Sequence, residues 1–384
     1  MSALLPGSRQ GHLDAAAAAH PGDLRNGGTA YCESLAAITD EWVRSLFDAA
    51  VAEHAPAKGR FALLAVGGFG RSELAPWSDL DLLLVHDLKG KKTAPTVEAV
   101  ASALWYPLWD AGVKLGHAVR TVKEQLTIIT ADLDSATALL TARFLAGDRD
   151  LADEVTTKGR ASWDRQSGTF LAALRARVRE RQDNAGDVAY RLEPDLKLGH
   201  GGLRDVHSLK WANESGLSIL PEDLIELERC YDVLLGARVA LHCSTGRPGD
   251  VLRLEDQDST AEVGGWNDAD DLMTDIAAAG RTIAWLVDEN WGRSVATADR
   301  LPDRAISSGI VLRNGEIELA DCADPVADPT LVLQAAVAAA RNDCRIGRST
   351  LDRLHDEVEP WKGIWPVGAT AQLVALLLEG HRSI

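Results

Sequence analysis

The sequence predicts an α+β protein in which a small α/β domain, a mixed sheet with helices, precedes a mostly α-helical bundle domain. Two observations carry this prediction. Short apolar runs typical of buried strands occur before residue 132, whereas apolar residues at helical spacing dominate after it. The 384 residues, of which 46% are hydrophobic and 25% charged, have an ordinary globular composition and suffice for two or three domains.

The elements of the α/β domain follow an N-terminal arm. Residues 1–30 mix Gly, Pro and Asn with an alanine run and predict a flexible arm with room for one short helix. Apolar residues at helical spacing then predict an amphipathic helix over Glu33–Glu53. Continuous apolar runs predict buried strands, the first of which ends at two glycines. We expect, in order, strands at 61–66 and 80–85, an exposed basic loop at 89–96, a helix at 97–109 and an extended segment at 114–121.

Helical spacing dominates the rest of the chain. Leu133, Ala136, Leu139, Leu140 and Phe144 fall on one face of a predicted helix. An Asn-Gly pair between two apolar arms predicts a β-hairpin over 310–319. Further helices are expected at 170–181, 224–241, 272–287, 330–341 and 369–379. The predicted domains are thus an arm at 1–30, a catalytic domain at 31–131, a helical domain at 132–300, and a hairpin with helices at 301–384.

Charge and cysteine usage exclude several classes of function. A net charge of -17 repels polyanions, so we expect no nucleic-acid partner. Four arginines between residues 175 and 181 spread around several faces of a helix and predict a solvated surface. The five cysteines lack metal-binding spacing, and no segment has the apolar length of a membrane span. We therefore expect a reduced, cytoplasmic protein without a membrane partner.

The window that carries chemistry is Gly67-Gly68-Phe-Gly70-Arg71-Ser-Glu73-Leu-Ala-Pro76-Trp-Ser78-Asp79-Leu-Asp81. Asp79 and Asp81 open a predicted strand and project from the same face, because side chains alternate along a strand. Two neighbouring carboxylates repel each other unless a cation lies between them. The pair therefore predicts a site for a divalent metal, Mg²⁺.

The glycine turn before this pair predicts a phosphate site. Gly67 and Gly68 let the backbone approach an anion, and the following helix start directs amides toward it. Arg71 and Ser78 are placed to contact the same phosphates. The spacing matches neither a dinucleotide fingerprint nor a P-loop. The alternative interpretation is a turn with a solvated acidic pair, which the Ser-Asp-x-Asp spacing makes the weaker one.

This pattern resembles the nucleotidyltransferase superfamily, in which a Gly-Gly or Gly-Ser turn precedes an Asp-x-Asp strand. More narrowly, it is similar to the bifunctional uridylyltransferase/uridylyl-removing enzymes that modify the PII nitrogen-signalling protein. A second segment, Lys197-Leu-Gly199-His-Gly201-Gly202-Leu-Arg204-Asp205, is similar to the Lys- and Gly-rich motif of that family and of glutamine synthetase adenylyltransferases. In it we expect Lys197, Gly201 and Gly202 to bind nucleotide, and Arg204 either to pair with Asp205 or to reach the nucleotide. An interdomain linker is the alternative.

The resemblance implies transfer of UMP from UTP to a tyrosine of PII, with release of pyrophosphate and dependence on Mg²⁺. The alternatives are AMP transfer from ATP to PII, as expected of some actinobacterial relatives, half of a glutamine synthetase adenylyltransferase, or a non-catalytic nucleotide- or PII-binding module. The extended segment at 114–121 contains no acidic residue, which argues against the glutamine synthetase enzyme. Asp79, Asp81 and Arg71 are the expected catalytic residues, and a third metal ligand and a general base remain unassigned.

The family also contains a metal-dependent HD hydrolase domain and two ACT sensing domains, for which this sequence has no pattern. His355-Asp356 is an isolated dipeptide and is expected to be a pair on a helix surface. We therefore expect a shortened chain without demodification activity or glutamine sensing.

Overall fold

The computed structural model describes residues 9–19, 23–90, 93–293 and 303–379. The chain forms two compact units, residues 1–291 and 292–384, and the predicted α+β class is confirmed. In the described part of the chain, no helix has both the length and the apolar character needed to cross a bilayer.

A four-stranded mixed sheet organises the first half of unit 1. Its order is β3-β2-β1-β4, with β1 antiparallel to both β2 and β4 and with β2 parallel to β3. All five residues of β1 are buried, as a continuous apolar run predicts for a central strand. The strands are β1 (Phe61–Ala65), β2 (Leu80–His86), β3 (Leu115–Thr121) and β4 (Arg143–Gly147).

The prediction that Phe144 continues a helical face is wrong. The helix ends at Leu140, and Phe144 lies in β4, opposite Leu64 of β1. A short apolar stretch is compatible with the periodicity of a helix and with that of a strand. Here it forms a strand, because it can pair with the free edge of β1. The sheet therefore takes its fourth strand from beyond residue 131, where a helical domain was expected to begin.

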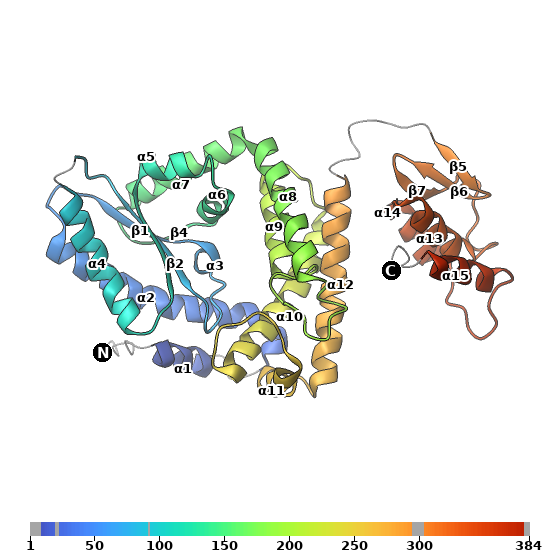
Figure 1. Ribbon diagram of the computed structural model, residues 1–384, viewed down its shortest axis with the longest axis horizontal. Coiled ribbons are helices and arrows are strands. Elements are labelled where there is room, and N and C mark those ends of the chain that lie inside the picture. Colours follow the sequence, from blue (N-terminus) through green and yellow to red (C-terminus); the bar gives the residue numbers. More distant parts are fainter. Residues whose placement is uncertain (1–8, 20–22, 91–92, 294–302, 380–384) are drawn as a thin grey trace. The chain divides into compact units, whose positions relative to one another are not determined.

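Helices lie on both sides of this sheet (Figure 1). On one side α2 packs against α4, and α5, α6 and α7 lie on the other. The arm expected at residues 1–30 contains a helix, α1, and the start of α2. These helices are α1 (Arg9–Ala19), α2 (Gly28–His54), α4 (Ala94–Asp110), α5 (Val122–Ile128), α6 (Leu133–Leu140) and α7 (Arg149–Arg165), with a 3-10 turn η1 (Leu24–Asn26) between α1 and α2.

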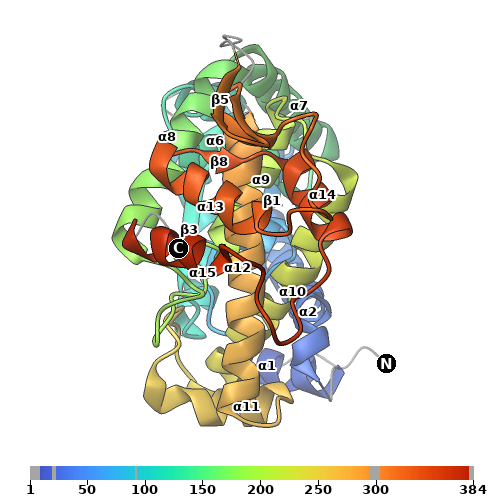
Figure 2. The ribbon, with the colours of Figure 1, turned by 90° about the vertical axis from the view of Figure 1, so that its right-hand side faces the viewer.

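The second half of unit 1 is the predicted helical bundle, whose long helices run side by side (Figure 1). Figure 2 shows α12 along its full length, with α11 beside one end, where Trp266 donates a hydrogen bond to Asp275. The helices are α8 (Ser167–Ala185), α9 (Leu203–Glu214), α10 (Pro221–Thr245), η3 (Leu254–Asp256), α11 (Gln257–Gly264) and α12 (Ala269–Arg293).

Unit 2 contains the predicted hairpin, in which β6 and β7 pair antiparallel. Asn314 and Gly315 have φ values of 53° and 84°, as the tight turn of a two-residue hairpin requires. His355 and Asp356 are exposed on α14, as predicted. The elements are β5 (Arg304–Ser307), β6 (Ile310–Arg313), β7 (Glu316–Leu319), α13 (Leu331–Asn342), β8 (Arg345–Ile346), α14 (Arg348–Glu357) and α15 (Ala369–Leu378).

Candidate active site

The Gly-Gly turn connects β1 to a single helical turn, α3 (Gly67–Gly70). Gly67 has a φ of 60°, which disfavours any residue with a side chain. A Cβ atom at this position would also stand 2.5 Å from Oδ2 of Asp81. The turn therefore needs glycine at position 67 for its backbone conformation and for the close approach of Asp81. A Cβ atom on Gly68 would make only ordinary van der Waals contacts, 3.6 Å from the carbonyl oxygen of Glu73 and 4.0 Å from a guanidinium nitrogen of Arg71.

Asp81 lies in β2 with its carboxylate beside this turn. The flanking residues Leu80 and Leu82 are 0% and 1% exposed, so the predicted alternation of buried leucines and projecting aspartates is confirmed. Asp79 stands just before the strand, and its Oδ2 lies 3.3 Å from Nζ of Lys114. Gly116 of β3 pairs with Asp81, and a Cβ atom at that position would overlap Oδ1 of Asp81. Two glycines thus enclose one carboxylate.

The electrostatics of Asp81 favour a bound cation. Burial, followed by the charge of Asp79, raises the pKa of Asp81 above its usual range. Within the described ranges no side chain donates a hydrogen bond to its carboxylate. The same ranges hold no cluster of three or more acidic, His or Cys side chains at metal-binding distance. Two carboxylates are nevertheless a fitting set for Mg²⁺, which commonly takes one or two from protein and its other ligands from water and substrate phosphates.

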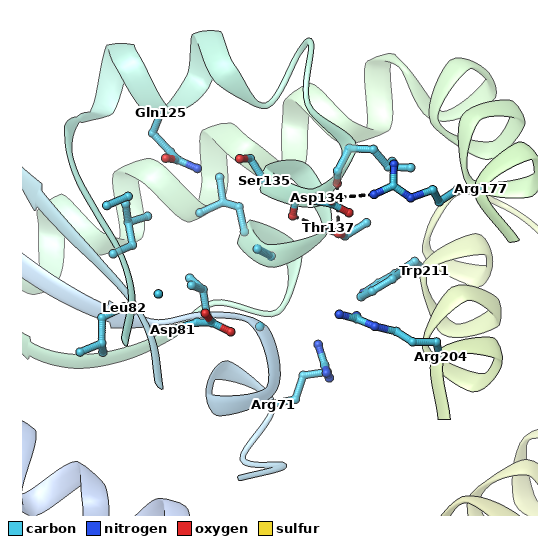
Figure 3. A pocket seen from close by; sticks show the side chains of 18 of the residues that line it. Arg71, Asp81, Leu82, Gln125, Asp134, Ser135, Thr137, Arg177, Arg204 and Trp211 are labelled. Atoms are coloured by element: carbon cyan, nitrogen blue, oxygen red, sulfur yellow. Dashed lines mark hydrogen bonds and ion pairs between the residues drawn. The ribbon is translucent and has the colours of Figure 1, made fainter. Parts of the chain in front are cut away.

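Two cavities meet at Asp81, and Gly67, Arg71 and Arg204 line both of them. The arginine-lined cavity, of about 610 Å³, lies between β3, α6, α8 and α9 (Figure 3). The lysine-lined cavity, of about 340 Å³, lies between the Gly-Gly turn, Lys114, Lys197 and α10. Each cavity takes residues from both the sheet and the helical bundle, so the candidate site lies between these two parts of unit 1.

The lysine-lined cavity gathers most of the predicted nucleotide contacts. Gly67, Gly68, Arg71, Ser78, Asp79, Asp81 and Lys197 all line it. Lys197 Nζ lies 3.4 Å from Asp250, which also accepts a 2.6 Å hydrogen bond from Nε of Arg238. A second nitrogen of Arg238 donates to Ser78 Oγ at 3.2 Å. Burial lowers the pKa of Lys197 from its usual value, so the ammonium gains from any anion brought into the cavity.

A buried network fixes Arg71. Its Nε donates to Oε2 of Glu73 at 2.5 Å, and the same oxygen lies 2.9 Å from Nε2 of His207. Tyr231 Oη lies 3.0 Å from that ring nitrogen. Burial opposes ionisation of Glu73, but the hydrogen bonds from His207 and Arg71, together with the charge of Arg71, outweigh it and hold the pKa of this carboxyl well below its usual range. Burial, with the charge of Arg71, lowers the pKa of His207 to about 3. The ring is therefore neutral at pH 7.

Of the two roles considered for Arg204, the pairing with Asp205 does not form. Asp205 instead accepts hydrogen bonds from Arg181, Gln182 and the backbone of Gly201. The Arg204 guanidinium faces Arg71 and Asp81 across the meeting point of the cavities (Figure 3) and lies 5.9 Å from the ring centre of Trp211. In the portion of the chain that the structure covers, Arg204 has no ion pair. Its guanidinium is largely buried and feels the charges of Asp134 and Asp81 without forming an ion pair with either of them.

Gly201 and Gly202 line neither cavity. Gly201 has a φ of 82°, and a Cβ atom there would overlap the backbone of Gly280 in α12. A Cβ atom on Gly202 would stand 2.8 Å from the carbonyl oxygen of Gly199. These glycines shape the loop that carries Lys197 and leads into α9, where Arg204 lies, and they let the loop pack on α12. The structure thus separates them from the other predicted nucleotide contacts.

Sequence reasoning missed several residues of the cavities. Glu73 lies inside the first quoted motif, and Gly116 lies in the predicted extended segment at 114–121, so both positions were within reach of sequence patterns. His207 and Arg238 lie on long helices with no local motif around them, and only folding brings them to the turn. His207 and Arg204 are three residues apart on α9 and therefore share a face. This helical spacing from Arg204 was the available signal for His207.

Two family models match the chain. Residues 27–125, which contain the Gly-Gly turn and both aspartates, match the family described as Putative nucleotidyltransferase DUF294. Residues 169–289 match GlnD PII-uridylyltransferase. The mixed sheet, its glycine turn and its paired aspartates therefore define a nucleotidyltransferase domain.

Curated relatives extend this likeness over most of the chain. Bifunctional uridylyltransferase/uridylyl-removing enzymes of Streptomyces coelicolor, Mycobacterium tuberculosis and Corynebacterium glutamicum are 39%, 38% and 35% identical to it. The alignments cover 91%, 84% and 82% of this chain, but 43%, 42% and 45% of the relatives. The chain is a homologue of the bifunctional uridylyltransferase/uridylyl-removing enzymes and spans less than half of their length.

Proposed function

We propose that the chain transfers UMP from UTP to a tyrosine hydroxyl of a PII protein in the cytoplasm, with release of pyrophosphate. The observation that carries this proposal is the position of Asp81, whose carboxylate stands beside Asp79 where two cation-lined cavities meet. The names of the relatives support the uridylyl donor and, through the matched family description, PII as acceptor.

The residues of the chain divide the work between binding and charge neutralisation. Asp79 and Asp81 would hold Mg²⁺, which when bound supplies Lewis-acid neutralisation of the triphosphate. The amides after Gly67 and Gly68, with Lys197 and Ser78, receive the β- and γ-phosphates in the lysine-lined cavity. This assignment follows from the cations and glycines that line that cavity.

Arg71 and Arg204 stand where negative charge grows during transfer. The acceptor oxygen forms a bond to the α-phosphorus while the bond from that phosphorus to the bridging oxygen of pyrophosphate breaks. The hydroxyl proton passes to water. Two guanidiniums beside the α-phosphate lower the barrier by neutralising the spreading charge. Glu73 and His207 act through Arg71 as positioning residues, because they hold its side chain in place.

The test is transfer of label from α-³²P-UTP and from α-³²P-ATP to purified PII protein with Mg²⁺. Wild-type chain is compared with Asp79→Asn/Asp81→Asn and with Asp164→Asn, which removes an exposed carboxylate on α7. Label from UTP that only the double variant loses supports the proposal. Label from ATP and not from UTP would show that ATP is the donor and that AMP is the transferred group. The absence of label from either nucleotide, with folded protein and a PII protein of the same organism, overturns transfer and favours a nucleotide-binding module.

A further inference from the structure

Strand β3 has a free backbone edge. It ends the sheet, and β2 is its one pairing partner among the strands that the structure describes. Leu80 N donates to Lys114 O at 2.9 Å, which fixes the parallel ladder: the backbone groups of Gly116 and Ala118 point toward β2. Those of Leu115, His117 and Val119 point outward, where no described residue hydrogen-bonds to them. His117 is exposed and its two neighbours are half-buried.

This edge adjoins the arginine-lined cavity. Gly116, Ala118 and Arg120 line that cavity together with Asp81. Gly116 and Asp81 are cross-strand partners, so they lie on the same face of the sheet. Gly116 has no side chain and Ala118 has a single methyl group, which leaves a path from the edge of the sheet to Asp81. Figure 3 shows the Asp81 carboxylate facing the space between α6 and the guanidiniums of Arg71 and Arg204.

The in-line geometry of the transfer determines which cavity holds the leaving pyrophosphate and which one admits the acceptor hydroxyl. The attacking and leaving oxygens must stand on opposite sides of the α-phosphorus. Lys114, Lys197 and Arg238 line the lysine-lined cavity, where the leaving pyrophosphate finds its counter-charges. The acceptor hydroxyl must then arrive from the arginine-lined cavity, on the β3 side of Asp81. This step rests on the proposed transfer reaction.

We propose that an extended segment of the acceptor protein adds to β3 as a fifth strand and presents its hydroxyl side chain across Gly116. Backbone pairing with an open sheet edge is a recurring way to bind peptides. Strands lie about 4.8 Å apart, so the added segment would stand about 10 Å from β2, and a tyrosine leaning over Gly116 covers most of that span. Lys114 and Arg120 border the edge, and Arg120 donates to the amide of Gln125 at 2.7 Å. These cations select an uncharged or acidic segment.

The decisive variant is Val119→Pro, which removes an outward N–H but no hydrogen bond to β2, because proline is tolerated where an edge N–H faces away from the sheet. Val119→Ala is the matched control, since it changes the same side chain and keeps the N–H. We expect Val119→Pro to raise the KM for PII about tenfold, the upper range for loss of one hydrogen bond. The KM for UTP should stay within twofold of wild type, and Val119→Ala should leave both values unchanged.

Amide hydrogen exchange of the wild-type chain decides the question without any variant. With PII and a non-hydrolysable UTP analogue present, we expect slower exchange in a peptide covering residues 114–121. Unchanged exchange there, while transfer to PII is intact, overturns strand addition and leaves the proposed function standing. An unchanged KM for PII in folded Val119→Pro does the same. Absence of transfer by the wild-type chain would instead overturn the proposed function.

Discussion

Gly116 stands directly opposite Asp81 in the ladder between β2 and β3, and the space that a Cβ atom would need at Gly116 is filled by Oδ1 of Asp81. On its other side the Asp81 carboxylate packs against a second glycine, Gly67, in the turn after β1, so the aspartate has little room to move away. The position of Asp81, the proposed metal ligand, therefore requires glycine at position 116.

Gly116→Ala is expected to lower the rate of nucleotidyl transfer about 100-fold, the cost typical of displacing a reacting group by about 1 Å. The matched control is Gly168→Ala on α8, where a Cβ atom meets nothing within 4 Å. Initial rates at saturating UTP and PII measure the effect, and thermal unfolding checks that both variants fold. A Gly116→Ala rate within threefold of wild type would show that Asp81 can move without loss.

Local patterns predicted the parts of the fold and site that are close in sequence. The β1 strand, the Gly-Gly turn and the Asp79–Asp81 pair lie within about twenty consecutive residues, so strand periodicity was enough to place them. Partners distant in sequence could not be found this way. Glu73 and His207 are 134 positions apart, and only packing of α9 against the turn joins them.

Of the two roles considered for Arg204, pairing with Asp205 fails for a simple geometric reason. Successive residues of an α-helix point about 100° apart, so neighbours at the start of α9 face different surroundings. Asp205 turns to α8 and meets Arg181, whereas Arg204 turns to the cavities. Adjacent opposite charges indicate an ion pair only where the backbone lets both side chains face the same way.

Arg204→Gln is expected to weaken substrate binding without weakening the fold. Its guanidinium lacks an ion pair in the described chain, and burying an unpaired charge costs free energy. Loss of a charged hydrogen bond to phosphate predicts a KM for UTP about 10- to 100-fold higher, and kcat should fall as well because Arg204 also neutralises charge that develops during transfer. The melting temperature should be equal to or above that of wild type. Arg229→Gln, which breaks an exposed pair with Glu226, is the control that should leave KM unchanged.

A lower melting temperature together with an unchanged KM for UTP in Arg204→Gln would contradict this account. That result would make Arg204 a structural residue that stabilises α9 through Trp211, rather than a ligand for phosphate.

The buried His207 predicts a pH dependence of stability. Its pKa falls from the ordinary 6.5 to about 3 in the folded state, so between these values the unfolded chain binds more protons. The free energy of unfolding is therefore expected to decrease as pH falls from 6.5 toward 3, by up to about 1.4 kcal/mol per pH unit for this group. Urea unfolding at pH 7, 6, 5 and 4 measures the slope.

His207→Gln removes the titrating ring but keeps a side chain that can donate to Glu73. The variant should be less stable than wild type at pH 7 and should show a shallower slope between pH 6.5 and 4. Equal slopes in the two proteins would mean that His207 does not titrate in this range. Activity at pH 7 should fall as well, because Arg71 depends on the same Glu73 oxygen.

The paired aspartates predict opposite effects of one substitution with and without Mg²⁺. Asp81 lies beside Asp79, and no described side chain donates a hydrogen bond to its carboxylate, so its charge destabilises the metal-free fold. Asp81→Asn is therefore expected to raise the melting temperature in EDTA by a few degrees. In millimolar Mg²⁺ the wild-type chain should gain stability through binding, whereas Asp81→Asn should not respond. Asp164→Asn, which removes an exposed charge, should retain the wild-type response.

An equal Mg²⁺ shift in wild type and Asp81→Asn would place the cation elsewhere. An asparagine at position 81 has no charge and one acceptor oxygen fewer, so it cannot hold Mg²⁺ as tightly as aspartate.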